Sequence, residues 1–167
     1  MRRGALFIAP LVVLLLAACG SSGGSNTTTT QQPRLTEALY RAQIAIVKRE
    51  AAKAQSDVSL GLQAKSVPEL KQRIDAFAAA TQRIADRLTA LNPPQNAEAA
   101  NAQLAQGLHD IAAGTRSASA KIAKLKSVGI AIAYLEHSKG PVKGSREVTK
   151  ALAKLQKLGY TTDAVTP

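Results

Sequence analysis

Apolar residues recur at helical spacing from Tyr40 onward and predict an amphipathic helix. The gaps between them alternate between four and three residues, at Tyr40, Ile44, Val47, Ala51, Ala54 and Val58. This spacing places all of these side chains on one face of a helix. The pattern ends near Gly61, so the sequence predicts a helix that packs through one apolar face.

A capping box predicts the start of a second helix. In Ser66-Val67-Pro68-Glu69 the serine can accept a first-turn amide, the glutamate can bond back, and proline suits the first turn. The heptad pattern that follows has apolar residues, and threonine at one position, at Leu70, Ile74, Phe77, Thr81, Ile84, Leu88 and Leu91. Asn92-Pro93-Pro94 ends this helix, because proline lacks a backbone donor and restricts its predecessor.

A third helix is expected after Pro94, with Asn96 as its N-cap. Its apolar positions again follow a heptad, at Leu104, Leu108, Ile111, Ala118, Ile122 and Leu125.

Residues 128–138 leave two interpretations open, because Gly129 weakens a continuing helix and the alternation of Ile130, Ile132 and Tyr134 also suits a strand. We favour a helix, since a lone strand would have no partner.

The last helix is expected to follow a loop at residues 138–144. Ser145 would cap it, and Val148, Leu152 and Leu155 would face inward. Gly159 suits a left-handed helix cap, with Tyr160 placed to contact Leu155.

These elements predict an all-α fold, an antiparallel bundle of three long helices plus a shorter C-terminal helix. Short connections place successive helices side by side and antiparallel. The bundle would form one domain at residues 34–160, followed by a disordered tail at 161–167. Beyond residue 18 the chain has one Phe, three Tyr and no Trp. Many of the apolar positions that form the inward face, or seam, of each predicted helix are alanine. Close approach of the helices would therefore have to stabilise the core.

The first eighteen residues have the order of an export signal. A basic start, Met1-Arg2-Arg3, precedes an apolar run from Ala5 to Ala18. That run has fourteen residues and contains Pro10, whereas a membrane-spanning helix needs about 20. A cleaved signal peptide at residues 1–18 is therefore the better prediction than a permanent anchor.

Leu16-Ala17-Ala18-Cys19 resembles the lipobox of bacterial lipoproteins. The resemblance implies that the signal is removed and that the Cys19 thiol carries a diacylglyceryl group. Cys19 is the only cysteine in the chain, so no disulfide accounts for it. A free cysteine after a simple secretion signal is the alternative. Lipidation at Cys19 would hold the protein at the outer face of the cell membrane, since two acyl chains give stable attachment.

A polar, uncharged segment separates Cys19 from the first helix. Residues 20–33 read GSSGGSNTTTTQQP, which is typical of a flexible linker. As a coil, residues 20–33 would span on the order of 20 Å. The threonine run could instead accept sugars, although a plain linker is the simpler interpretation.

Two segments of the domain resemble small helical lipoproteins of high-GC Gram-positive bacteria. One is Leu88-Thr89-Ala90-Leu91-Asn92-Pro93-Pro94, at a helix end, and the other runs from Ala151-Leu152-Ala153-Lys154-Leu155 to Gly159-Tyr160. These are packing and turn signals. The resemblance therefore implies fold and location, and no activity.

Positive charge is concentrated in the C-terminal half of the chain. The formal charge of +11 falls to +9 once Arg2 and Arg3 are removed, and residues 114–159 carry ten basic against two acidic side chains, or +8. This concentration of positive charge favours a function in which the protein contacts an anionic surface. The alternative is a solvated face that keeps the protein soluble. The candidate contact residues are Arg116, Lys121, Lys124, Lys126, Lys139, Lys143, Arg146, Lys150, Lys154 and Lys157.

The sequence offers few residues for catalysis or metal binding. Its two histidines, His109 and His137, would lie roughly 42 Å apart on one continuous helix, given a 1.5 Å rise per residue. His109 follows the seam residue Leu108 and is expected to face solvent. We therefore expect no catalytic residues, no metal and no cofactor. Nucleic acid is not an expected partner, because base-stacking aromatic residues are nearly absent.

Two functional hypotheses follow. The first is a non-enzymatic, membrane-tethered module of the cell envelope, which contacts anionic lipid, a wall polymer or an envelope protein through its basic half. The second is an extracytoplasmic carrier with a small ligand between its helices. The apolar seams favour the first hypothesis.

Overall fold

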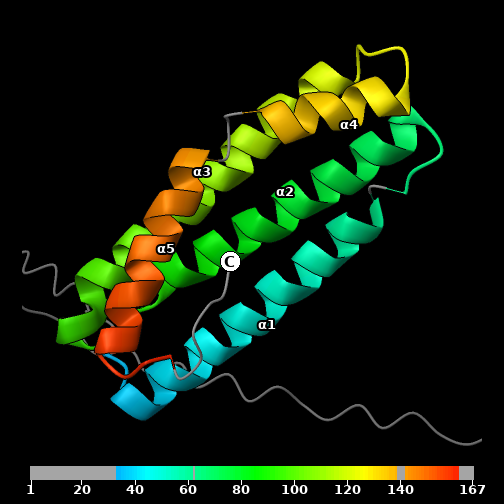
Figure 1. Cartoon of the computed structure of the whole chain (residues 1–167). Helices are drawn as coiled ribbons and strands as arrows, with labels where there is room; N and C mark the ends of the chain where they lie inside the picture. Colours follow the sequence, from blue (N-terminus) through cyan, green and yellow to red (C-terminus); the bar gives the residue numbers. More distant parts are fainter. Residues whose placement is uncertain (1–32, 62, 139–141, 162–167) are drawn as a thin grey trace, which may run out of the picture. The chain divides into compact units, whose positions relative to one another are not determined.

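Five α-helices and a short 3₁₀ helix form the described part of the chain (Figure 1). The computed structural model describes residues 33–61, 63–138 and 142–161. The predicted signal peptide, Cys19, the linker up to residue 32, Lys139 and tail residues 162–167 lie outside these ranges. The elements are α1 (Glu37–Gly61), α2 (Val67–Ala90), η1 (Gln95–Ala97), α3 (Glu98–Ile122), α4 (Val128–His137) and α5 (Val142–Lys157). No strand occurs within the described ranges, and the all-α prediction is confirmed.

Helix α3 lies at the centre of the bundle. It packs against α2 and α5, while α1 packs against the other side of α2 (Figure 1). The three long helices have 25, 24 and 25 residues and are joined by short connections. The prediction of three long helices and a shorter C-terminal helix is therefore confirmed, and α4 is an additional short helix.

The predicted seams meet in one main core. Buried side chains from α1, α2, η1, α3 and α5 contribute to it together with Tyr160. Its larger members are Tyr40, Ile44, Val47, Ile84, Leu88, Leu104, Leu108, Leu155 and Tyr160. The helical periodicity thus identified the larger side chains of this core, because residues three and four apart share one helix face.

The sequence predicted the N-cap of α2 correctly and the N-cap of α3 incorrectly. Ser66 caps α2 as expected, accepting a hydrogen bond from the amide of Glu69 at 3.3 Å, and the Glu69 carboxylate accepts from the Lys65 amide at 2.9 Å. Asn96 does not cap α3. It lies inside η1, and its side chain instead accepts a hydrogen bond from the Tyr160 hydroxyl at 2.8 Å.

The third predicted helix does not continue through residues 128–138. Helix α3 ends at Ile122, and Ser127 caps the separate helix α4 by accepting from the Ile130 amide at 3.4 Å. Helix α4 folds back against α3 and α2, where its buried Ala131 joins Ile122 in a second apolar cluster (Figure 1). Segment 128–138 is thus helical as favoured, but the chain reverses before it.

Helix α5 begins earlier than predicted and ends where predicted. It starts at Val142, so Ser145 lies within its first turns and the predicted loop at 138–144 is too long. At its other end Gly159 has a φ of +75°. The amide of Tyr160 donates to the carbonyl of Leu155 and that of Gly159 to Gln156, both at 2.9 Å, which is the Schellman pattern.

Candidate functional site

The described part of the bundle has two distinct ends. At the proximal end the chain enters α1 beside the α2–α3 connection, where Leu35 donates its amide to the carbonyl of Asn92 at 2.7 Å. The Arg34 guanidinium bonds the Pro93 carbonyl at 3.1 Å and pairs with Glu98 at 2.9 Å. The distal end holds the α1–α2 connection and the α3–α4 turn. With 25 residues in α3, the ends are separated by about 37 Å.

Aromatic contacts join α1 to the C-terminal cap at the proximal end. The rings of Tyr40 and Tyr160 meet edge to face with their centroids 4.9 Å apart. The Arg41 guanidinium lies 5.8 Å from the centre of the Tyr160 ring and donates to the Gly159 carbonyl at 3.1 Å. Burial, and then the nearby Tyr160, raise the pKa of Tyr40 well above its usual range. The end of α5 is therefore held at the point where the chain enters the bundle.

The structure separates the predicted basic contact residues into groups. Five lie on α5 and three lie at or after the end of α3, while Arg116 lies within α3 and Lys139 is outside the described residues. The α5 group is Lys143, Arg146, Lys150, Lys154 and Lys157, which we call the α5 stripe. The distal group is Lys121, Lys124 and Lys126, and all three are exposed.

The α5 stripe forms one face of its helix. Its spacings of three, four, four and three residues confine all five side chains to an arc of about 80° at 100° per residue. The apolar residues Val148, Ala151 and Leu155 pack into the main core from the other side. The stripe therefore lies on the side of α5 away from the main core, although Lys143 and Lys154 reach side chains of α3. Helix α5 extends from mid-bundle to the proximal end (Figure 1).

Few carboxylates neutralise the stripe. Lys150 pairs with Glu147 at 3.0 Å, and Lys143 lies 3.8 Å from Asp110. The Lys154 ammonium donates to the amide oxygen of Gln103 at 2.7 Å, which leaves its charge uncompensated. Hydrogen bonds from Gln103 and Lys150 lower the pKa of Glu147 and keep that carboxyl ionised. Helix α5 carries five basic side chains and one acidic side chain, so its net charge is +4.

A recess of about 720 Å³ lies at the distal end, between the start of α2 and the α3–α4 turn. Three lysines line it, namely Lys65, Lys71 and Lys126. Lys71 pairs with Asp75 of the same helix, whose carboxylate also accepts a hydrogen bond from Ser119. Burial raises the pKa of Asp75, but the hydrogen bonds from Lys71 and Ser119 outweigh it and the net shift is downward. We refer to this feature as the distal recess.

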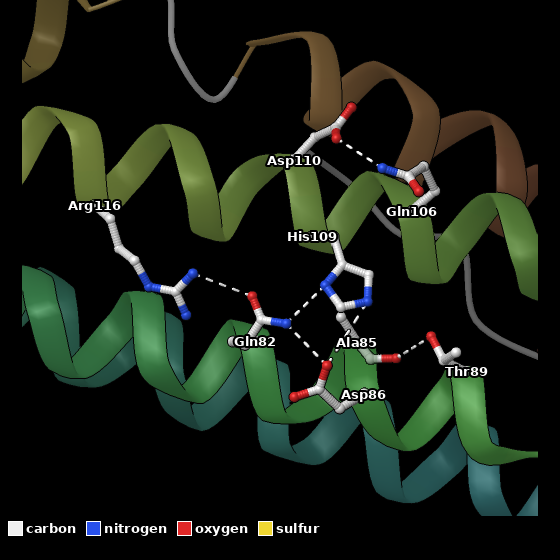
Figure 2. A network of polar contacts seen from close by, with 8 residues as sticks. All are labelled: Gln82, Ala85, Asp86, Thr89, Gln106, His109, Asp110 and Arg116. Atoms are coloured by element: carbon white, nitrogen blue, oxygen red, sulfur yellow. Dashed lines mark hydrogen bonds and ion pairs between the residues drawn. The ribbon is translucent and has the colours of Figure 1, made fainter.

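His109 lies in a polar network between α2 and α3 (Figure 2). Its Nδ1 is 2.7 Å from the side-chain nitrogen of Gln82, which also donates to Asp86 at 2.8 Å, and Arg116 donates to the Gln82 oxygen at 3.2 Å. With the Gln82 amide nitrogen as donor, Nδ1 accepts this hydrogen bond, and Nε2 lies 3.7 Å from Asp86. The expectation of a solvent-facing His109 holds only in part, since its side chain is 31% exposed and contacts Gln82.

Asp110, the next residue on α3, faces away from His109 (Figure 2). Its carboxylate accepts from Gln106 at 2.9 Å, on the side of α3 that faces α5 (Figure 2). The 42 Å separation expected for His109 and His137 does not apply, because it assumed one continuous helix and the chain reverses after α3. Among the described residues, no group of three or more histidine, cysteine or acidic side chains is placed to hold a metal ion.

The buried polar side chains of the described bundle all form hydrogen bonds. Every buried side-chain nitrogen or oxygen described has a hydrogen-bond partner. The buried Asn101, for example, accepts from the Tyr40 hydroxyl at 3.1 Å and donates to the Leu88 carbonyl at 2.9 Å. None of the described helices combines the length and apolar character needed to cross a bilayer.

Comparison with known proteins gave no match to this chain among protein-family models, curated proteins or solved structures.

Sequence reasoning missed two residues of the distal recess. Lys65 and Lys71 precede the charge-rich C-terminal half and were not candidates, because only folding brings the start of α2 beside the α3–α4 turn. Ser127 was also missed as a helix cap. A serine directly before the apolar run Val128-Gly129-Ile130 is the signal that could have identified it.

Proposed function

We propose that this chain is a lipid-anchored, non-enzymatic protein of the cell envelope. In this proposal Cys19 carries the lipid, and the α5 stripe lies against the anionic headgroups of the membrane that holds it. The observation that carries the proposal is the position of the stripe. It faces away from the core and reaches the same end of the bundle at which the chain emerges from the linker.

The distances support this orientation. A linker that spans on the order of 20 Å keeps the proximal end close to the bilayer. Each basic side chain near an anionic membrane surface contributes about 1 kcal/mol. The net +4 of α5 would therefore contribute on the order of 4 kcal/mol at low salt, in addition to the lipid anchor. Screening weakens this attraction as ionic strength rises.

The anchor is tested on the native protein. Mass spectrometry of the N-terminal peptide from isolated membranes should show a chain that begins at Cys19 and carries a diacylglyceryl group. The Cys19→Ser variant should leave the membrane fraction. An unmodified N-terminus in the wild-type protein would contradict the proposed anchor.

The stripe is tested separately, with the chain from residue 19 onward carrying Cys19→Ser. This protein should sediment with phosphatidylglycerol vesicles at low salt, and not with phosphatidylcholine vesicles. Arg146→Glu/Lys157→Glu should weaken binding at least tenfold. Lys121→Glu/Lys124→Glu makes the same change in net charge at the distal end and should weaken it by much less. Equal losses would show that net charge, and not the stripe, determines binding.

For the carrier hypothesis, the structure changes where a ligand would bind. The main core is filled by side chains from α1, α2, α3 and α5, so the described apolar helix faces pack against one another and not around a ligand. The observation that favours a small ligand is instead the distal recess at the surface. A carrier function therefore depends on what that recess binds.

A further inference from the structure

The distal recess combines positive charge with apolar walls. Its volume of about 720 Å³ lies within the 300–1,000 Å³ typical of small-molecule sites. Lys65 and Lys71 come from the start of α2 and Lys126 from the α3–α4 turn, and apolar residues including Val67, Leu125 and Val128 also line it. No acidic residue lines it.

Two of the three lysines form no ion pair among the described residues. Lys71 is paired with Asp75, whereas Lys65 and Lys126 have no carboxylate within ion-pair distance among the described residues. The nearest acidic residue in the sequence, Glu69, is already engaged by the Lys65 amide and by the Arg73 guanidinium at 2.8 Å. Hydrogen bonds from these two groups lower the pKa of Glu69, so it remains ionised and paired. An incoming anion would therefore meet a Lys126 ammonium without a carboxylate partner among the described residues, and a Lys65 ammonium that also interacts electrostatically with Glu69.

The backbone adds to this positive potential. The recess lies at the first turns of both α2 and α4, and Ser66 and Ser127 of its lining are the N-caps of those helices. Amides at a helix N-terminus carry partial positive charge. The same turns present apolar side chains to the recess, Val67 from α2 and Val128 from α4. The site thus suits a molecule with an anionic head and an apolar portion.

We propose that the distal recess binds a phosphorylated amphiphile. Its phosphate lies between Lys65 and Lys126, and its apolar portion lies against Leu125 and Val128. Phosphate is an anion that ammonium groups and the amides of helix N-termini both bind. The recess is about 37 Å from the proximal end, as judged from the length of α3. The site therefore does not depend on the lipid anchor and is distinct from the α5 stripe.

The test uses the chain from residue 19 onward carrying Cys19→Ser, so that failure of the anchor cannot affect the result. Its amide NMR spectrum is recorded during titration with inorganic phosphate, dihexanoylphosphatidic acid and dihexanoylphosphatidylcholine, each below its micelle concentration. Saturable shifts should centre on Val67, Val128 and Gly129. Dihexanoylphosphatidic acid should bind at least tenfold more tightly than either of the other two probes.

Matched variants locate the site. Lys65→Gln/Lys126→Gln should weaken binding of dihexanoylphosphatidic acid at least tenfold. Lys121→Gln/Lys124→Gln removes the same charge from the same end of the bundle, outside the recess, and should change it less than twofold. Circular dichroism checks that both variants fold, as expected for exposed lysines. Equal weakening by both variants, absence of saturable shifts, or equal affinity for phosphate and the amphiphile would each overturn the proposal.

Discussion

Gly107 on α3 and Gly144 on α5 meet face to face where these two helices cross. A Cβ on Gly144 would lie 2.5 Å from the Gly107 carbonyl oxygen and 2.8 Å from the Ile111 amide nitrogen. A Cβ on Gly107 would lie 3.0 Å from the Gly144 oxygen and 2.9 Å from a methyl group of Val148. Backbone atoms cannot rotate away as side chains do, so this approach requires glycine on both helices. The crossing positions the α5 stripe on the bundle.

Gly144→Ala should destabilise the bundle by about 2 kcal/mol, within the range for overpacked contacts. The reason is that its methyl group would have to separate α5 from α3. Gly129→Ala is the control, because a Cβ there meets nothing within 4 Å and alanine favours a helix. Urea unfolding should place Gly144→Ala below the wild type and Gly129→Ala at or above it. Similar midpoints for the two variants would contradict the close crossing.

Tyr40→Phe should cost about 1–3 kcal/mol, the penalty for leaving a buried polar atom without its partner. The Tyr40 hydroxyl donates to Asn101, which is 4% exposed, so water cannot readily replace it. Tyr160→Phe should cost less, because its partner Asn96 is exposed to solvent. Thermal or urea unfolding of both variants measures the difference. The reverse order would show that the Tyr40–Asn101 bond is not an important contact.

The bundle should lose stability in acid as three carboxyls are protonated. Hydrogen bonds to Lys65 and Arg73 lower the pKa of Glu69, and the net pKa shifts of Asp75 and Glu147 are also downward. Between the lowered pKa values and the unfolded values near 4, the unfolded chain binds more protons. The stabilisation is therefore present above about pH 5 and is lost as pH falls through the lowered values.

Unfolding free energies measured from pH 6 to pH 2 check this expectation. Glu69→Gln/Asp75→Asn should show a shallower decline than the wild type, because two of the titrating groups are removed. A parallel decline would mean that other carboxyls cause the acid sensitivity.

Removing the Ser66 cap should destabilise the whole bundle, whereas removing the Ser127 cap should mainly loosen α4. Ser66→Ala and Ser127→Ala should each cost about 1 kcal/mol. Helix α2 has 24 residues and many buried side chains, so Ser66→Ala should lower global stability. Helix α4 has ten residues and only Ala131 is fully buried, so Ser127→Ala should mainly speed amide hydrogen exchange within α4. Uniform exchange changes across the bundle in Ser127→Ala would contradict this.

Local patterns in the sequence were enough to predict the helices and much of the core. Tyr40, Ile44 and Val47 are buried as their spacing predicted, and Ser66 and Gly159 act as the predicted caps. These features depend on residues within one or two helical turns of each other. The lipobox at Cys19 is equally local, but it lies outside the described residues and remains a prediction.

Only the tertiary structure decided how the charges and the last two helices are arranged. The basic C-terminal half reads as one region, yet the α5 stripe lies between mid-bundle and the proximal end, whereas Lys121, Lys124 and Lys126 lie at the distal end. Which surface charges become neighbours depends on the crossing of α5 over Gly107 and on the chain reversal before α4. Those contacts join residues distant in the sequence, and the periodicity of one helix does not specify its partner.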